Sequence, residues 1–240
     1  MRHVKTRLLT YWQNAGSKEI VFFGGIMAFC LSVWFFLAAA GWAAHESFQQ
    51  VEAHWMRALR NPADPSDLAG PWWVEELARD ISALGSAVVV IMLSLFVIGF
   101  LLLRQYWGRA SLVVVTVLGG YLLSNALKSS YARARPDVVP HLTEVSSASF
   151  PSGHSMVSSL VYLTLGALLA QTTPRRREKI YFLVTAVVLT GLIGVSRVAL
   201  GVHYPTDVLA GWSAGTAWAL ACLLIAWKWR QGRLGRKPGH

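Results

Sequence analysis

The chain has 240 residues, of which 54% are hydrophobic and only 14% are charged, and it contains eleven tryptophans. This composition is too apolar for an ordinary soluble domain and indicates an integral membrane protein. A formal net charge of +10 would also suit a nucleic-acid-binding protein. However, 15 of the 22 lysines and arginines lie in four short segments between apolar runs. This placement is typical of membrane topology, so we expect a lipid bilayer and no nucleic acid as partner.

Six apolar runs are predicted to cross a membrane as helices, three of them with fewer residues than a typical span. The predicted spans are 20–44, 84–103, 110–127, 156–171, 180–195 and 205–229. The first run ends near a stretch of small residues that could be a signal-peptide cleavage site, but it is too long for a signal peptide, so we expect an uncleaved helix. We therefore predict one all-α domain over residues 1–240, built as a bundle of six transmembrane helices.

The basic segments lie before residue 20, at 104–109, at 175–179 and from 228 onward. The positive-inside rule then places both termini in the cytoplasm and the connections 45–83 and 129–152 on the outer side. Spans three to five contain about 16–18 residues, roughly 24–27 Å of helix. Polar residues at their outer ends should therefore lie at the depth of the lipid headgroups. The basic tail after the last span is expected to be disordered.

The connection 45–83 contains two short segments with helical patterns. In the first, Phe48, Val51, Trp55 and Leu59 recur at helical spacing, which predicts a helix lying on the membrane surface. A stretch rich in proline and glycine follows, and a second short helix then begins at two adjacent tryptophans, residues 72 and 73. Arg79-Asp80 in this second helix is interpreted as part of a local ion pair. His45 and His54 are interpreted as ordinary residues of this connection.

The stretch Phe150-Pro151-Ser152-Gly153-His154-Ser155 is a polar turn between two apolar runs. Ser152 is a good N-cap for the helix that follows. The first N–H groups of a helix have no partner within it, so this turn can bind an anion. Gly153 allows a bulky oxyanion to approach closely because it has no side chain. We therefore predict that Ser152 and Gly153 bind a phosphate group beside His154.

Two further clusters lie at the ends of neighbouring spans. Lys128 is followed after six residues by Arg135-Pro136, and Ser196-Arg197 is followed by His203 and then Asp207. Three cations that converge on one site would form a clamp for an oxyanion, and the planar fork of arginine matches phosphate geometry. We predict that Lys128, Arg135 and Arg197 form this clamp.

The three clusters in this order resemble the signature of the type-2 phosphatidic acid phosphatase (PAP2) superfamily. The resemblance covers residues 128–207. It implies a helical core shared with acid phosphatases and vanadium haloperoxidases, and phosphoryl transfer without a metal or other cofactor.

Cys30 and Cys222 lie in apolar runs, and no Cys or His spacing matches a zinc site. Arg133 and His141 lie outside the family pattern and are interpreted as a surface residue and a loop residue.

The remaining polar residues of the pattern can carry out acid–base and nucleophilic chemistry. His203 can attack phosphorus when it is neutral, and Asp207 can accept the second ring N–H and stabilise the developing charge. His154 can protonate the leaving oxygen. The hypothesis is hydrolysis of a phosphate ester or diphosphate through a phosphohistidine. The alternative without catalysis is that these polar residues only cap the starts of two helices.

A site at headgroup depth in a membrane protein favours a lipid phosphate as substrate. The resemblance allows undecaprenyl diphosphate, phosphatidylglycerol phosphate, phosphatidic acid, diacylglycerol diphosphate or lipid A, in the cytoplasmic (inner) membrane of a bacterium with the site facing outward. We favour an undecaprenyl-diphosphate phosphatase or a broad lipid phosphatase. The alternatives are a lipid A phosphatase, a lipid-to-lipid phosphotransferase, and a lipid or anion transporter without chemistry.

Overall fold

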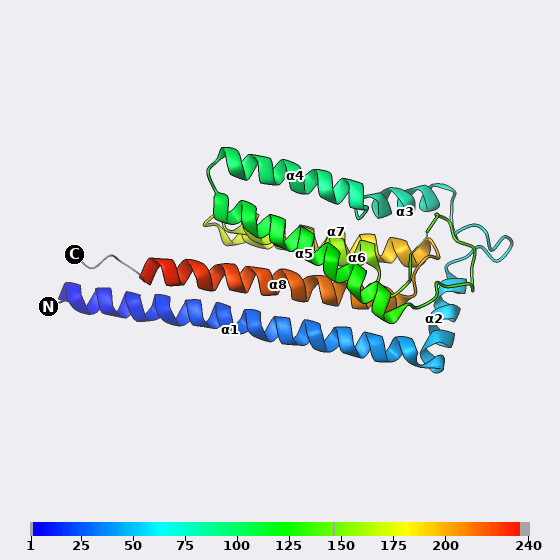
Figure 1. Ribbon diagram of the computed structural model, residues 1–240, viewed down its shortest axis with the longest axis horizontal. Helices are drawn as coiled ribbons and strands as arrows, with labels where there is room; N and C mark the ends of the chain where they lie inside the picture. Colours follow the sequence, from blue (N-terminus) through cyan, green and yellow to red (C-terminus); the bar gives the residue numbers. More distant parts are fainter. Residues whose placement is uncertain (1, 146, 236–240) are drawn as a thin grey trace.

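The computed structural model describes residues 2–145 and 147–235, and within them every helix or strand element is an α-helix. The helices are α1 (Arg2–Ala44), α2 (Glu46–Ala58), α3 (Trp73–Ala83), α4 (Ala87–Leu103), α5 (Trp107–Tyr131), α6 (Gly153–Ala170), α7 (Arg176–Ala199) and α8 (Pro205–Gly235). The long helices lie side by side, and α2 crosses one end of the bundle (Figure 1). The expectation of a disordered tail after residue 229 is wrong for its first part, because α8 continues to Gly235; residues 236–240 lie outside the described residues.

The helices confirm an all-α membrane bundle. Five helices in the described residues are long and apolar enough to span a membrane: α1, α5, α6, α7 and α8. The pair α3 and α4 passes the same test as one unit bent by 45°, which gives up to six spans. The predicted second span therefore corresponds to α4, which continues across a short break into α3.

Two of the spans expected to be short are longer than predicted. Helix α5 has 25 residues and α7 has 24, because each continues past its apolar stretch into polar residues at its C-terminal end. Lys128 is in the last turn of α5, and Arg197 is in the last turn of α7. Helix α5 stops where Ala132 adopts a left-handed conformation, with φ of 45°. The two cations are therefore held on rigid helix ends rather than on loops.

Helix α6 lies at the centre of the bundle and packs against α4, α5, α7 and α8. Its residues Met156, Leu160 and Val161 are fully buried or nearly so and form one core cluster with residues of α4 and α8. In a membrane the lipid chains are as apolar as these side chains, so close van der Waals packing, and not removal from water, stabilises the position of α6. The N-terminus of α6, which carries the polar turn, is consequently fixed relative to α7 and α8.

Helices α6 and α8 approach each other closely through Gly211 and Gly215, two small residues four positions apart on α8. A Cβ atom on Gly215 would lie 2.3 Å from the carbonyl oxygen of Met156, and one on Gly211 would lie 2.6 Å from that of Ser152. Both neighbours are backbone atoms of α6 or its cap. Any side chain at these positions would force the two helices apart.

The segment between α1 and α4 confirms both predicted short helices. Four large apolar side chains of α2 and its C-cap are each at least 40% exposed, Phe48, Val51, Trp55 and Leu59, whereas Met56 of α2 is buried. Helix α3 begins at Trp73, and its Arg79 forms the expected local ion pair, with Glu75 as the partner at 2.5 Å. Arg79 also donates a hydrogen bond to the carbonyl of Leu142, which ties the 132–152 loop to α3.

Gly215→Ala should lower the apparent Tm of the purified protein in detergent, because the added methyl meets backbone rather than a movable side chain. We expect a cost of about 1–3 kcal/mol, as for other overpacked sites. Gly99→Ala on α4 is the matched control, since a Cβ there meets nothing within 4 Å and alanine is the better helix former by up to about 1 kcal/mol. Equal Tm shifts in the two variants would contradict the close α6–α8 contact.

Candidate active site

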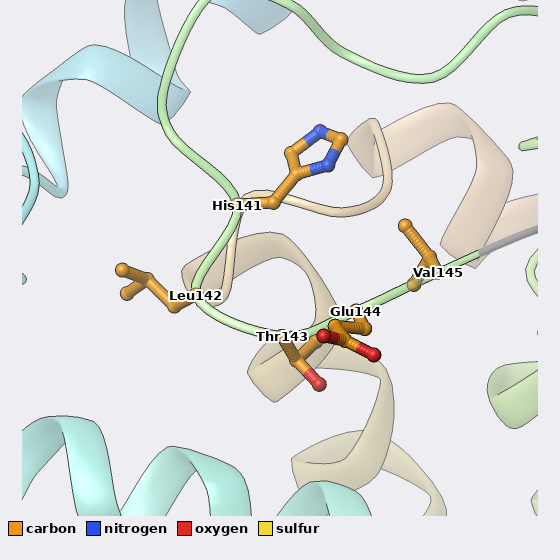
Figure 2. A pocket seen from close by; sticks show the side chains of 5 residues that line it. All are labelled: His141, Leu142, Thr143, Glu144 and Val145. Carbon is orange, nitrogen blue, oxygen red and sulfur yellow. The ribbon is translucent and has the colours of Figure 1, made fainter.

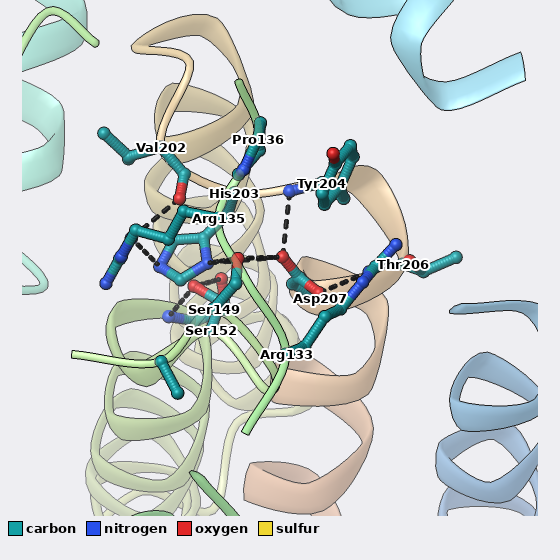
Figure 3. A network of polar contacts seen from close by, with 12 residues as sticks. Arg133, Arg135, Pro136, Ser149, Ser152, Val202, His203, Tyr204, Thr206 and Asp207 are labelled. Carbon is teal, nitrogen blue, oxygen red and sulfur yellow. Dashed lines mark hydrogen bonds and ion pairs between the residues drawn. The ribbon is translucent and has the colours of Figure 1, made fainter. Parts of the chain in front are cut away.

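The three sequence clusters meet at one end of the bundle, which we call the motif end. Arg135 donates a hydrogen bond through Nη1 to the carbonyl of Val202 at 2.7 Å, and its Nη1 lies 3.4 Å from His203 Nε2. The N–H of Ser152 donates to the carbonyl of Asp207 at 2.9 Å. The first and second clusters therefore both contact the third (Figure 3). The motif end is the end of the bundle opposite to the start of α1 and the end of α8 (Figure 1).

His203 lies in the short turn between α7 and α8 and is almost completely buried. Its Nδ1 is 3.5 Å from Asp207 Oδ2, longer than an ordinary N–H···O hydrogen bond. The hydroxyl of Ser149 lies between them: it donates to Asp207 Oδ2 at 2.5 Å, and its oxygen is 3.3 Å from His203 Nδ1. A hydroxyl that donates to a carboxylate can still accept from the imidazole N–H. The histidine and the aspartate are thus linked through Ser149, with their nearest atoms 3.5 Å apart, and Nε2 faces Arg135.

Burial and neighbouring charges keep His203 neutral at physiological pH. Burial, together with the positive charges of Arg135 and Arg197, lowers the pKa of His203 to about 4 in spite of the opposing effect of Asp207. Burial likewise lowers the pKa of Arg135, although a guanidinium stays charged at pH 7. A neutral imidazole with a free Nε2 is the form that can act as a nucleophile.

Asp207 is fully buried in the first turn of α8, and both of its oxygens are occupied. Oδ2 accepts the backbone N–H of Tyr204 at 2.9 Å, the back-bond of a helix capping box. Oδ1 accepts from Arg133 Nη1 at 2.6 Å. The interpretation of Arg133 as a surface residue is wrong: its side chain is only 14% exposed and forms ion pairs with Asp207 and with Glu52 of α2.

Three cations lie around His203 and His154 without a carboxylate of their own. In the described part of the chain, Lys128, Arg135 and Arg197 form no ion pair; they bind instead to carbonyls and hydroxyls of the 132–152 loop, the turn before α8 and α3. Lys128 Nζ donates to the carbonyl of Ala148 at 2.5 Å, and Arg197 Nη1 donates to Ser82 Oγ at 2.7 Å. Uncompensated positive charge in a partly buried site is the electrostatic condition for binding an oxyanion.

The start of α6 has the helix cap that the sequence of the polar turn predicted. Ser152 is the N-cap: its Oγ accepts from the N–H of Ser155 at 3.5 Å and from the hydroxyl of Ser155 at 3.0 Å. A Cβ on Gly153 would lie 3.3 Å from Lys128 Cε, so the lysine chain lies directly over the glycine. His154, in the same first turn, is within electrostatic range of His203 and of Lys128, Arg135 and Arg197. The structure thus brings together all eight predicted site residues.

The 132–152 loop also lines an open hollow at the motif end, with a volume of about 860 Å³ (Figure 2). Its lining residues are His141, Leu142, Thr143, Glu144 and Val145. His141 is a loop residue, as predicted, and its Nε2 donates to the carbonyl of Pro136 at 2.6 Å. This hydrogen bond restrains the backbone of residues 136–141, which follow Arg135.

Among the described residues, no group of three His, Cys, Asp or Glu side chains is placed to hold a metal ion.

Sequence reasoning missed Ser82, Arg133 and Ser149, whose side chains contact predicted site residues, and Glu52, which is joined to Asp207 through Arg133. Glu52 and Ser82 come from the distant helices α2 and α3, and no spacing rule connects them to the clusters. Arg133 and Ser149 lie close to the clusters in sequence. Their charge or polarity in a short loop between two spans was the available signal, but it did not reveal the direction of the side chains.

Comparison with known proteins agrees with this geometry. The chain matches the family model of the PAP2 superfamily over residues 108–231, more than half of its length, and it belongs to that superfamily. It is 37% identical to phosphatidylglycerophosphatase B of Bacillus subtilis (strain 168) over 147 residues, covering 60% of this chain and 70% of that protein. It is also 29% identical to lipid A 1-phosphatase of Rhizobium etli, covering 65% of this chain and 72% of the relative.

A third relative, undecaprenyl-diphosphatase of Sulfolobus acidocaldarius, is 31% identical and covers 44% of this chain and 47% of that protein. Among solved structures, the crystal structure of a transmembrane PAP2 type phosphatidylglycerolphosphate phosphatase from Bacillus subtilis matches with a TM-score of 0.71 at 28% identity. The match covers 88% of this chain and 98% of that one. The chain is therefore a multi-pass membrane lipid phosphatase, a phosphoric-ester hydrolase.

Ser149→Ala should reduce kcat about tenfold, equivalent to about 1.4 kcal/mol, because Asp207 and His203 lose the hydroxyl that joins them. KM should change little, since Ser149 Oγ is directed to the carboxylate. Phosphate release from a short-chain lipid phosphate in detergent measures both constants. Ser129→Ala is the control, because the hydroxyl of Ser129 bonds only within α5. Wild-type kcat in Ser149→Ala would contradict the bridging role.

Proposed function

We propose that this protein removes a phosphoryl group from a lipid phosphate or diphosphate in two steps, with His203 as the nucleophile. The observation that carries the proposal is a buried neutral imidazole whose Nε2 lies next to Arg135, at one end of the bundle where, among the described residues, Lys128 and Arg197 also lack carboxylate partners. This arrangement suits attack on a phosphoryl group, where most of the catalytic need is stabilisation of charge on the equatorial oxygens. We further propose that residues 1–240 act as one domain.

In the first step, the phosphoryl oxygens bind Lys128, Arg135, Arg197 and the start of α6 at Ser152 and Gly153. His203 Nε2 attacks phosphorus in line, the bond from phosphorus to the lipid oxygen breaks, and His154 donates a proton to the departing oxygen. Asp207 stabilises the positive charge that develops on the imidazole ring. In the second step, His154 takes a proton from water, the water oxygen attacks phosphorus, and the phosphorus–nitrogen bond breaks to release phosphate. The positive charge comes from side chains, and the proposed steps use no metal.

The lipid is proposed from the position of the site. The motif end lies at the end of the membrane-spanning helices, next to an amphipathic helix with an exposed apolar face, so the phosphoryl group should enter from the headgroup layer. The proposed clamp and catalytic residues would bind only the phosphoryl group, so they do not distinguish one lipid from another. We favour undecaprenyl diphosphate or a broad range of lipid phosphates, including phosphatidylglycerol phosphate and phosphatidic acid.

Two narrower enzymatic alternatives act through the same clamp: hydrolysis of lipid A phosphates and transfer of the phosphoryl group to a second lipid. Reaction with labelled undecaprenyl diphosphate and labelled lipid A separates them, because hydrolysis yields free phosphate and transfer yields a phosphorylated lipid. A transporter without chemistry is not retained, since the chain belongs to a family of phosphatases and a carrier has no use for the paired histidines.

We propose that the protein lies in the cytoplasmic membrane of a bacterium, with the motif end facing outward. The start of α1, the end of α8 and the turns between α4 and α5 and between α6 and α7 lie at the opposite end (Figure 1). Among the described residues, 13 of the chain's 22 lysines and arginines lie in or beside these segments. The positive-inside rule places this basic end in the cytoplasm.

The first test is turnover. Wild-type protein should release phosphate from a lipid phosphate in the presence of EDTA. His203→Ala and His154→Ala should each lower kcat by on the order of 10³-fold or more, as for residues that act as a catalytic unit. His54→Ala on the exposed face of α2 is the matched control, and size-exclusion profiles confirm folding. Near-wild-type rates in His203→Ala would contradict the nucleophile assignment, and EDTA inhibition reversed by a divalent metal would contradict a metal-free reaction.

The second test is orientation. Thr143→Cys and Arg176→Cys are introduced separately into a background with Cys30→Ser and Cys222→Ser, which removes the two free native thiols. An impermeant maleimide should label position 143 in intact cells and position 176 only after permeabilisation. The reverse pattern would place the active site in the cytoplasm.

A further inference from the structure

Arg133 forms a buried bridge between two carboxylates from different helices. It donates to Asp207 Oδ1 on α8 at 2.6 Å and to Glu52 Oε2 on α2 at 3.2 Å. The exposed fractions of the three side chains are 14% for Arg133, 3% for Glu52 and zero for Asp207. Arg133 also donates to Thr206 Oγ1 at 2.9 Å and lies 4.2 Å from the centre of the Tyr204 ring. Its guanidinium is therefore held on several sides (Figure 3).

Glu52 is bound at both of its oxygens. Oε2 receives Arg133, and Oε1 accepts the backbone N–H of Thr206 at 2.6 Å. Thr206 is in the first turn of α8, where N–H groups have no partner within the helix and the helix dipole favours negative charge. Glu52 therefore caps α8 from another helix, one residue before Asp207. Helix α2 is in this way attached to the residues that hold His203.

We infer that Arg133 and Glu52 are positioning residues for the reaction of His203, acting through the Asp207 carboxylate. The inference rests on the proposed function of His203 as nucleophile. Arg133 occupies the carboxylate oxygen that does not face the imidazole, so the carboxylate cannot rotate away from His203. Glu52 holds the guanidinium in that position and fixes the backbone turn that carries Asp207.

A bridge that served only to attach α2 would not need these charges. Removing charges from water is costly, and well-packed apolar residues of similar size stabilise a fold at least as well as a buried ion pair. Helix α2 already buries Ala53 and Met56 on the same side. The charged bridge ends on the carboxylate that contacts the proposed nucleophile, which indicates a role in the reaction beyond attachment.

The bridge also has an electrostatic consequence for His203. The charged or titratable groups that face His203 are Asp207 from α8, Arg135 from the 132–152 loop, Arg197 from α7 and His154 from α6. The positive charge of Arg133 partly neutralises Asp207, so the carboxylate attracts a proton on the imidazole less strongly. Without Arg133 the carboxylate would stabilise protonated His203 more strongly. The resting enzyme would then lose its neutral nucleophile at a higher pH.

The test compares kcat, KM and the pH profile of phosphate release for Arg133→Gln, Glu52→Gln and the double variant. We expect Arg133→Gln to lower kcat about 10–100-fold, the range for a misplaced catalytic group, with little change in KM. The acidic limb of its kcat/KM profile should move to higher pH. Glu52→Gln should have a smaller effect, and the double variant should be no worse than Arg133→Gln, because the pair acts as one unit. Glu46→Gln, an exposed position on the same helix, is the control.

Arg133→Lys keeps the charge but cannot bind both carboxylates with a planar fork. It should recover part of kcat and return the acidic limb toward its wild-type position, and with Glu52→Gln it carries the test if Arg133→Gln does not fold. Wild-type kcat and an unmoved acidic limb in folded Arg133→Gln, or a lysine variant no better than glutamine, would overturn the inference. A wild-type protein that releases no phosphate would instead contradict the proposed function.

Discussion

The buried carboxylate of Asp207 is the interaction on which the motif end depends. It lies in the first turn of α8 and receives the N–H of Tyr204, the hydroxyl of Ser149 and the guanidinium of Arg133 while it faces His203. An ionised group without these partners would be far too costly to bury. Because these partners come from the turn before α8 and from the 132–152 loop, stabilising this one charge holds both segments against the start of α8.

A second constraint is the excess of positive charge beside that carboxylate. Arg133 is neutralised by Glu52 and Asp207, whereas Lys128, Arg135 and Arg197 bind carbonyls and hydroxyls. Lys128 and Arg197 are held on the last turns of α5 and α7, so they cannot move far to find a counter-ion. Burial in this field keeps His203 neutral. The same charges that suppress protonation of the histidine create a place for an anion.

The packing of α6 against α7 and α8 fixes the position of this site. Gly211 and Gly215 allow α8 to approach the backbone of α6, which places the turn at Ser152 and Gly153 next to the start of α8. The N–H of Ser152 then reaches the carbonyl of Asp207 at 2.9 Å. Packing in the apolar core thus sets the distance between the proposed phosphate cradle and the proposed nucleophile.

The sequence by itself determined the membrane class and the apolar spans, and it predicted the eight site residues that the fold places at one end, because hydrophobic run length, charge placement and motif spacing are local properties of the chain. It also placed Ser152 as a helix cap from the residues around it. Only the tertiary structure decided how the buried charges are paired. Arg133 looked like a surface residue until the fold brought Glu52 to it from 81 positions away, and Ser149 became part of the His203–Asp207 contact through the path of one loop. The physical reason is that a buried charge is stabilised by whichever partner the packing of the helices delivers, and that partner leaves no periodic or spacing signal in the sequence.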